Sequence, residues 1–169
     1  GIDNVNPVEL IDLNKRLLKS VLGNVVDPID QWADANTVDV IKDMKDSGLE
    51  NMWIGLDDWQ EGFIKPELVK EAEDLGYLIG SYDSYHSIHE PGKEKWETAK
   101  FKDTSLYQDA TVTNKDGNKI EGFQGVGRKL NPTLAMPSVE ERVTSILDTG
   151  IAFNSWFLDT DGTGEIYDD

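Results

Sequence analysis

A repeated unit constrains the fold of this chain most strongly. Three times an amphipathic helix is followed by a glycine, a short link, a run of apolar residues and an aspartate. The runs predict strands at about 51–56, 77–82 and 153–158, and we expect them to be parallel neighbours in chain order. The helices between them would serve as crossovers. The unit therefore predicts an α/β fold, and by itself it fits a closed barrel and an open sheet equally well.

Ordinary start and stop signals bound the helices. Proline in a first turn and glycine after a last turn are typical of helix ends. The capping-box spacing of Ser138 and Glu141 predicts that Ser138 caps the last helix. The predicted helices run from Pro7 to about Leu22, from an N-cap at Asn36 to Ser47, from Pro66 to Gly76 and from Ser138 to Gly150.

The segment at about 84–137 does not follow the repeated helix–strand unit. Within it, residues 110–113 and 119–123 flank Asp116-Gly117, which predicts a β-hairpin. The hairpin would belong to an insertion in one βα-loop, on the side of a parallel sheet where such loops build active sites. We treat residues 1–169 as one domain, although a complete eight-stranded barrel needs about 250 residues. A barrel interpretation therefore requires a partial barrel.

The net charge of −17 limits the classes of partner. Such a surface repels phosphate backbones and anionic lipids, so we expect neither nucleic-acid nor membrane partners. The chain has no cysteine, which excludes disulfides and thiolate metal sites and is compatible with the cytoplasm or with export. No apolar run approaches the length of about 18 residues that suggests a membrane span.

Every predicted strand ends in carboxylates, namely Asp57 with Asp58, Asp83, and Asp159 with Asp161. The carboxyl ends of parallel strands converge on the functional crevice of α/β proteins. A single aspartate there could simply cap the next helix. Aspartates at the ends of three neighbouring strands favour a functional site instead. We therefore expect these carboxylates to face one cleft.

Aromatic residues accompany the carboxylates. Flat apolar rings beside carboxylates suit sugar rings, which present C–H patches framed by hydroxyl groups. Trp59 and Tyr85 follow strand ends and are candidates for the binding surface, whereas Trp53 and Trp156 lie inside strands and are expected in the core. His86 lies close enough to a strand end to touch a ligand.

Two other kinds of chemistry fit parts of the sequence. Phe157-Leu-Asp-Thr-Asp-Gly-Thr163 matches the first motif of haloacid-dehalogenase phosphatases, in which the first aspartate attacks phosphorus with the help of Mg²⁺. That motif normally opens its domain, and here only six residues follow it. A calcium loop from Asp159, Asp161 and Glu165 lacks the EF-hand spacing. His86 and His89 are spaced for a metal only on a helix, and they precede Pro-Gly. We therefore expect no metal and no cofactor.

Three strings resemble glycoside hydrolase family 129, which is related to the family 101 endo-α-N-acetylgalactosaminidases. They are residues 51–60, 80–86 and 154–165. The resemblance implies a (β/α)₈ TIM barrel whose nucleophile is Asp159. The family's acid/base residue is a glutamate on the following strand, which this chain does not reach.

The resemblance also implies a substrate class. Both families are retaining enzymes that act on the α-linked N-acetylgalactosamine of mucin-type O-glycans. We expect a carbohydrate substrate, substrate contacts from Asp57, Asp58, Trp59, Asp83, Tyr85, His86 and Asp161, and the remainder of the parent barrel as the partner. We expect the enzyme to be secreted or periplasmic. The chain alone would hold half of the catalytic pair and be inactive. The alternatives are the phosphatase and a non-catalytic sugar-binding α/β domain.

Overall fold

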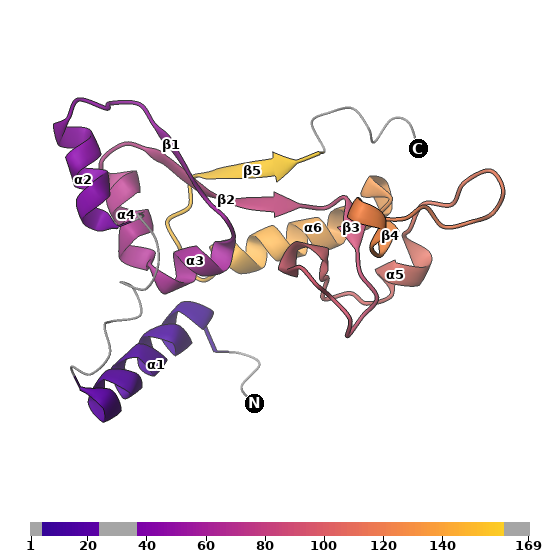
Figure 1. Cartoon of the computed structure of the whole chain (residues 1–169), viewed down its shortest axis with the longest axis horizontal. Coiled ribbons are helices and arrows are strands. Elements are labelled where there is room, and N and C mark those ends of the chain that lie inside the picture. Colours follow the sequence, from indigo (N-terminus) through magenta and orange to yellow (C-terminus); the bar gives the residue numbers. More distant parts are fainter. Residues whose placement is uncertain (1–4, 24–36, 161–169) are drawn as a thin grey trace. The chain divides into compact units, whose positions relative to one another are not determined.

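Three parallel strands form the main sheet of the protein. The structure is a computed structural model that describes residues 5–23 and 37–160. Strands β1 (Trp53–Leu56), β2 (Leu78–Ser84) and β5 (Ser155–Asp159) pair in the order β1-β2-β5 (Figure 1). The prediction of parallel neighbours in chain order is confirmed. An open three-stranded sheet does not by itself distinguish a partial barrel from an open α/β sheet.

Helices precede each of these strands, and their first turns carry the expected signals. Pro7 occupies the first turn of α1, and the Asn6 side chain caps it by accepting from the Val8 N–H. The cap of α2 is Thr37, one residue after the Asn36 that the sequence suggested, and Asn36 itself lies outside the described residues. The helices are α1 (Pro7–Leu22), α2 (Val38–Asp46), α3 (Trp59–Ile64), α4 (Pro66–Asp74), α5 (Leu106–Asp109) and α6 (Pro132–Leu147), with 3₁₀ turns at Glu97–Ala99 and Phe123–Gly125. In the described part of the chain, none of them is long and apolar enough to cross a membrane.

Helix α6 begins seven residues earlier than predicted, because its cap is Asn131 and not Ser138. Asn131 caps it, because its Oδ1 accepts from the backbone N–H groups two and three residues later. Pro137 therefore lies inside the helix, where it removes one backbone hydrogen bond, and Ser138 is an interior residue rather than a cap. Glu141, the other member of the predicted capping box, instead accepts a hydrogen bond from Lys102. The prediction of a start at Ser138 is wrong.

The described residues form two compact units, each with its own core. Among the described residues, the first unit comprises 5–23, 37–82 and 146–157, and the second comprises 83–145 and 158–160. The core of the first unit contains Ile41, Ile54, Leu56, Trp59, Phe63, Leu68, Val69, Ala72, Tyr77, Ile79, Ile146, Ile151 and Phe153. The core of the second unit contains Ile88, Phe101, Leu106, Ala110, Leu130 and Ala135.

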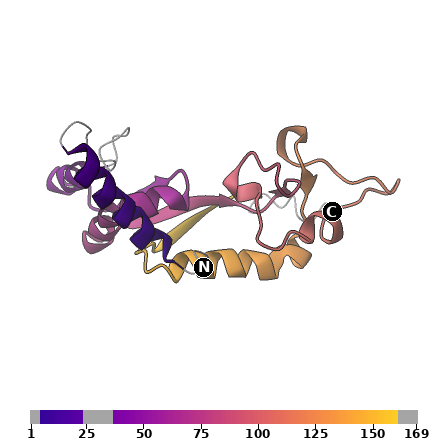
Figure 2. The same cartoon turned by 90° about the horizontal axis from the view of Figure 1, so that it is seen from below.

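Strands β2 and β5 lie side by side in both views (Figures 1 and 2). Asn154 donates its backbone N–H to the Ile79 carbonyl, and its side-chain Oδ1 accepts from the Ile79 N–H. A Cβ atom at Gly80 would lie 2.1 Å from the Ser155 carbonyl oxygen. Glycine at position 80 therefore permits the close approach of the two strands.

The insertion after β2 belongs to the second unit. Strand β3 (Ser87–Ile88) pairs antiparallel with β4 (Arg128–Lys129). The predicted hairpin is present as a short turn, in which Thr113 and Lys119 form an antiparallel bridge. Asn114 closes it, because its Oδ1 accepts from the backbone N–H groups of Asp116 and Asn118.

Candidate active site

Asp159 is the last residue of strand β5, and its side chain is half-buried. Thr160 follows it with a φ of 67°, a conformation that a β-branched residue rarely adopts. The strand therefore ends where the sequence predicted, and the backbone turns away directly after the carboxylate. Strained backbone of this kind recurs at functional sites. The Asp161 carboxylate, which the sequence also singled out, lies outside the described residues.

Asp159 and Asp83 lie on opposite faces of the sheet. The Trp53 Nε1–H donates to Ser155 Oγ at 3.0 Å, so the two side chains share a face. Asp159 lies on the same face as Ser155, because side chains alternate along a strand. Trp53 is paired with Leu78, and Asp83 is five residues beyond Leu78, so alternation places Asp83 on the other face. The predicted common cleft for Asp83 and Asp159 is wrong.

Asp83 is fully buried and paired with a buried arginine. Its Oδ1 accepts a hydrogen bond from Arg142 Nη1 at 2.9 Å and another from the Ser84 backbone N–H at 2.8 Å. Burial raises the pKa of the Asp83 carboxyl above its ordinary 3.8, and the Arg142 guanidinium is the largest opposing cause. Hydrogen bonds from Ser84, Tyr85 and Arg142 also act to lower the pKa. Asp83 is thus an internal ion-pair partner and is not exposed to a cleft.

Arg142 joins three parts of the second unit. Its guanidinium comes from helix α6, pairs with Asp83 at the end of β2 and donates through Nη2 to the Lys100 carbonyl in the insertion. It also lies 4.1 Å from the centre of the Phe101 ring and 5.6 Å from that of Tyr85. The end of β2, the insertion and α6 are therefore fastened to one another at a single side chain.

Sequence reasoning missed Arg142, although a signal for it was available. Arg142 is three residues after Val139 and four before Ile146, two apolar residues that pack into the cores. Helical spacing places all three on one face of α6. A charge on an otherwise apolar helix face requires a buried partner of opposite charge. The buried aspartate at the end of β2 fulfils that requirement.

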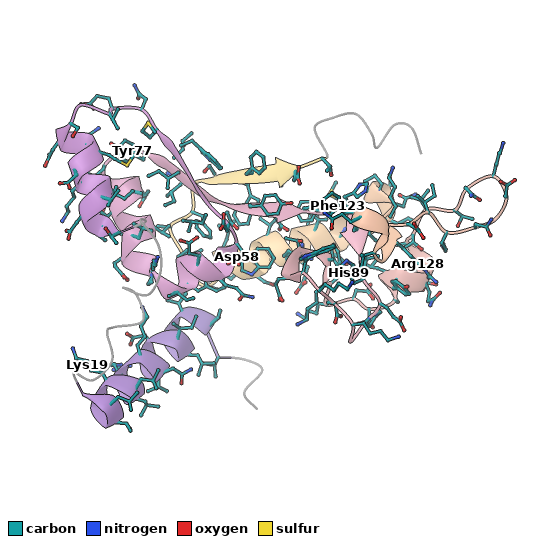
Figure 3. All side chains as sticks on the ribbon, in the orientation of Figure 1. Lys19, Asp58, Tyr77, His89, Phe123 and Arg128 are labelled. Carbon is teal, nitrogen blue, oxygen red and sulfur yellow. The ribbon has the colours of Figure 1, made fainter. Side chains whose placement is uncertain are left out.

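Of the two aspartates that follow β1, Asp57 and Asp58, the second has a structural role. Asp58 caps helix α3, since its Oδ1 accepts from the Glu61 N–H at 2.9 Å (Figure 3). Asp57 is exposed. Trp59 is only 8% exposed and lies in the core of the first unit, whereas Trp53 is 45% exposed. The predicted exposure of Trp59 and burial of Trp53 are both wrong, while Trp156 packs against the core as expected.

Tyr85 and His86 occupy the link between β2 and β3, and both are half-buried. The His86 carbonyl accepts from the Leu130 N–H, which fixes this link against the residue that follows β4. His89 is buried, and its Nδ1 accepts from the Lys95 N–H.

Within residues 5–23 and 37–160, no group of three or more His, Cys, Asp or Glu is placed to hold a metal. The expectation that no metal or cofactor is needed stays a prediction.

The parallel sheet and its preceding helices make this an α/β domain. Many enzymes of this class carry their catalytic carboxylates at the ends of such strands, as Asp159 is placed here. Residues 43–169 match the model of a family described as "Glycosyl hydrolases related to GH101 family, GH129". The chain therefore belongs to glycoside hydrolase family 129, and the resemblance in its sequence is confirmed. No curated protein sequence matches the chain. The phosphatase alternative gains no support from these findings.

Solved structures of one bacterial enzyme have a similar fold. The α-N-acetylgalactosaminidase NagBb from Bifidobacterium bifidum, in complex with Gal-NHAc-DNJ, is 16% identical, with a TM-score of 0.54 over 80% of this chain and 25% of that one. Its ligand-free structure is 18% identical, with a TM-score of 0.55 over 73% of this chain and 22% of that one. At such identities the likeness concerns the fold. The chain spans about a quarter of the length of these proteins.

Proposed function

We propose that this chain is part of a retaining α-N-acetylgalactosaminidase of mucin-type O-glycans, with Asp159 as its nucleophile. The position of Asp159 carries the proposal, because this carboxylate ends the third parallel strand within the segment that matches family 129. The strained Thr160 after it supports the same residue. The names of the similar NagBb structures support the choice of sugar.

The reaction would proceed in two displacements. The Asp159 carboxylate attacks the anomeric carbon and forms a glycosyl ester while a general acid protonates the departing glycosidic oxygen. Water then hydrolyses the ester with the help of the same acid/base group, and the anomeric configuration is retained. Asp83 is a poor choice for that second carboxyl, because it is buried against Arg142. We assign the acid/base role to the remainder of the parent protein.

The proposed fold is a (β/α)₈ barrel of which this chain supplies a part. Three parallel strands in chain order, each preceded by a helix, support it. The chain alone would then be inactive, since it lacks the second carboxyl group. Exposed Asp57, half-buried Tyr85 and His86, and Asp161 remain proposed substrate contacts. Because mucin-type glycans are extracellular, we propose that the enzyme works outside the cytoplasm.

Substitution of Asp159 in the full-length parent protein tests the proposal. Asp159→Ala should abolish hydrolysis of an aryl α-N-acetylgalactosaminide, and added azide should restore turnover with a glycosyl azide as product. Asp161→Asn should cost less, on the order of 10²–10³ in kcat. Asp109→Ala, which removes an exposed carboxylate of α5, is the control and should leave turnover unchanged. Near-normal turnover of Asp159→Ala, or Mg²⁺-dependent release of phosphate from an aryl phosphate, would contradict the proposal.

A further inference from the structure

The insertion in the second unit exposes two neighbouring aromatic rings. Trp96 is 37% exposed and Phe123 is 57% exposed. Their ring centres lie 6.0 Å apart, with the planes inclined at 58°. Neither ring belongs to the core of this unit. Contiguous exposed apolar surface is one mark of a binding site.

The Trp96 ring and the Phe123 backbone contact strand β3 and the residue that follows it. Trp96 packs on the His89 ring, with the centres 4.7 Å apart, and the neighbouring Lys95 N–H donates to His89 Nδ1 at 3.0 Å. The Phe123 backbone N–H donates to Ser87 Oγ at 2.8 Å. The next residue, Gln124, has a φ of 54°, which is uncommon for a residue with a side chain. The Trp96 ring is thus held against His89, and the backbone that carries Phe123 is fixed to β3; Figure 3 labels His89 and Phe123.

His89 supplies a hydrogen-bond donor beside the rings. Because Nδ1 accepts a hydrogen bond, the proton of the neutral imidazole is on Nε2. Burial lowers the pKa of His89, which keeps the ring neutral. Nε2 is buried and has no hydrogen-bond partner among the described residues. A buried donor without an acceptor is unfavourable, so an acceptor supplied by a ligand would be stabilised here.

Glycine lies next to the edge of the His89 ring. A Cβ atom at Gly127 would be 2.7 Å from His89 Cδ2, the carbon bonded to Nε2, and φ at this glycine is +69°. Position 127 therefore carries no side chain over this edge of the imidazole. Trp96 covers the ring from another side and is more than one third exposed. Nε2 is buried in this structure, so a ligand oxygen would reach it only if a neighbouring group moved aside.

The charges around His89 and on the neighbouring chain are mixed, because Lys95 and Glu94 shift the pKa of His89 in opposite directions. Lys93 pairs with Glu90 at 2.9 Å, and Lys100 lies 3.9 Å from Glu97. These cations are therefore compensated by adjacent carboxylates. The chain as a whole carries a net charge of −17, which repels anions. A ligand here should combine an apolar face with neutral oxygen acceptors.

We propose that Trp96, Phe123 and His89 form a second carbohydrate-binding site, which takes a neutral pyranose of the N-acetylhexosamine or hexose class. The C–H face of the sugar would pack on the exposed rings, and a hydroxyl or N-acetyl oxygen would accept from His89 Nε2. The site involves no residue to which we assign a part in the chemistry. Binding here therefore does not depend on the catalytic role proposed for Asp159.

Fluorine NMR of the full-length parent protein labelled with 5-fluorotryptophan tests the site. The Trp96 resonance is assigned by its loss in Trp96→Phe, and N-acetylgalactosamine and galactose are the probes. We expect a saturable shift of this resonance with a dissociation constant in the millimolar range, on the order of 1–10 mM. Phe123→Ala and His89→Phe should each weaken binding about tenfold. Leu134→Ala removes a similarly exposed apolar side chain from α6, 54% exposed, and should leave the affinity unchanged.

The outcomes separate this site from the proposed catalysis. The shift should persist in Asp159→Ala, whether or not that variant hydrolyses substrate. A Trp96 resonance that does not move up to about 100 mM of either sugar would overturn the proposal. So would a resonance that a soluble paramagnetic agent fails to broaden, because the remainder of the protein would then cover the rings. Equal weakening by Leu134→Ala would show that the effect is not specific to these rings.

Discussion

Replacement of Arg142 by methionine should destabilise the protein severely. The change removes the guanidinium but keeps much of the apolar stem, so Asp83 stays fully buried without its charge partner. Removing one partner of a buried ion pair lowers the free energy of unfolding by about 3–5 kcal/mol. The hydrogen bond to the Lys100 carbonyl is lost as well, which adds about 1 kcal/mol. The double variant Asp83→Leu/Arg142→Met should recover much of the loss, because apolar residues of similar volume can replace such a pair.

The loss in Arg142→Met should also depend on pH. The pKa of Asp83 is already raised by burial, and removal of Arg142 takes away the largest cause that lowers it. Between the ordinary value of 3.8 and the raised value, the folded protein binds this proton more tightly than the unfolded chain. The contribution of Asp83 to stability therefore falls as the pH rises through that window. Arg142→Met should lose less free energy of unfolding at about pH 4 than at about pH 7.

Urea unfolding of the 169-residue chain, followed by circular dichroism, measures these changes in free energy. The wild-type chain and the two variants are compared at both pH values. A loss of less than about 1 kcal/mol in Arg142→Met at neutral pH would refute the buried-pair account, because that is the range of exposed ion pairs. No recovery in the double variant would point instead to packing against Phe101 and Tyr85.

Two further changes are expected to alter stability, and the same urea titrations check both. Asp58→Ala removes the cap of α3 and should cost about 0.5–2 kcal/mol, whereas Asp57→Ala, at an exposed neighbour, should stay within about 0.5 kcal/mol. Equal effects of the two would contradict the capping role. Gly80→Ala brings a Cβ within 2.1 Å of the Ser155 carbonyl and should cost about 1–3 kcal/mol or more. Gly55→Ala should lower the free energy of unfolding by less, because there only the exposed Trp53 ring has to move. A larger loss for Gly55→Ala than for Gly80→Ala would contradict this explanation.

The parallel sheet could be predicted because its signals are local. Each strand is a short apolar run after a glycine stop, and each run ends in aspartate, so chain order and direction follow from sequence neighbours. The position of Asp159 at a strand end follows in the same way. Its role as the nucleophile is a proposal that rests on the resemblance to a family.

Contacts between distant residues could not be predicted from local patterns. The Asp83–Arg142 pair joins residues 59 apart, and only the charge on an apolar helix face hinted at it. The exposures of Trp53 and Trp59 were inverted because the short helix α3 was not recognised, and this helix turns Trp59 into the core. Ser138 had capping-box spacing, but Asn131-Pro132 offered an earlier cap followed by a proline at the first helical position.

Mass spectrometry of a trapped glycosyl-enzyme tests the central claim most directly. The full-length parent protein is incubated with a 5-fluoro N-acetylgalactosaminyl fluoride, a slow substrate for which breakdown of the covalent ester limits turnover, and is then digested for peptide mapping. The account predicts one added sugar on the peptide that contains Asp159, and no label in the Asp159→Ala variant. A sugar attached to a different carboxylate, or enzyme that turns over the substrate without ever carrying a label on this peptide, would contradict it.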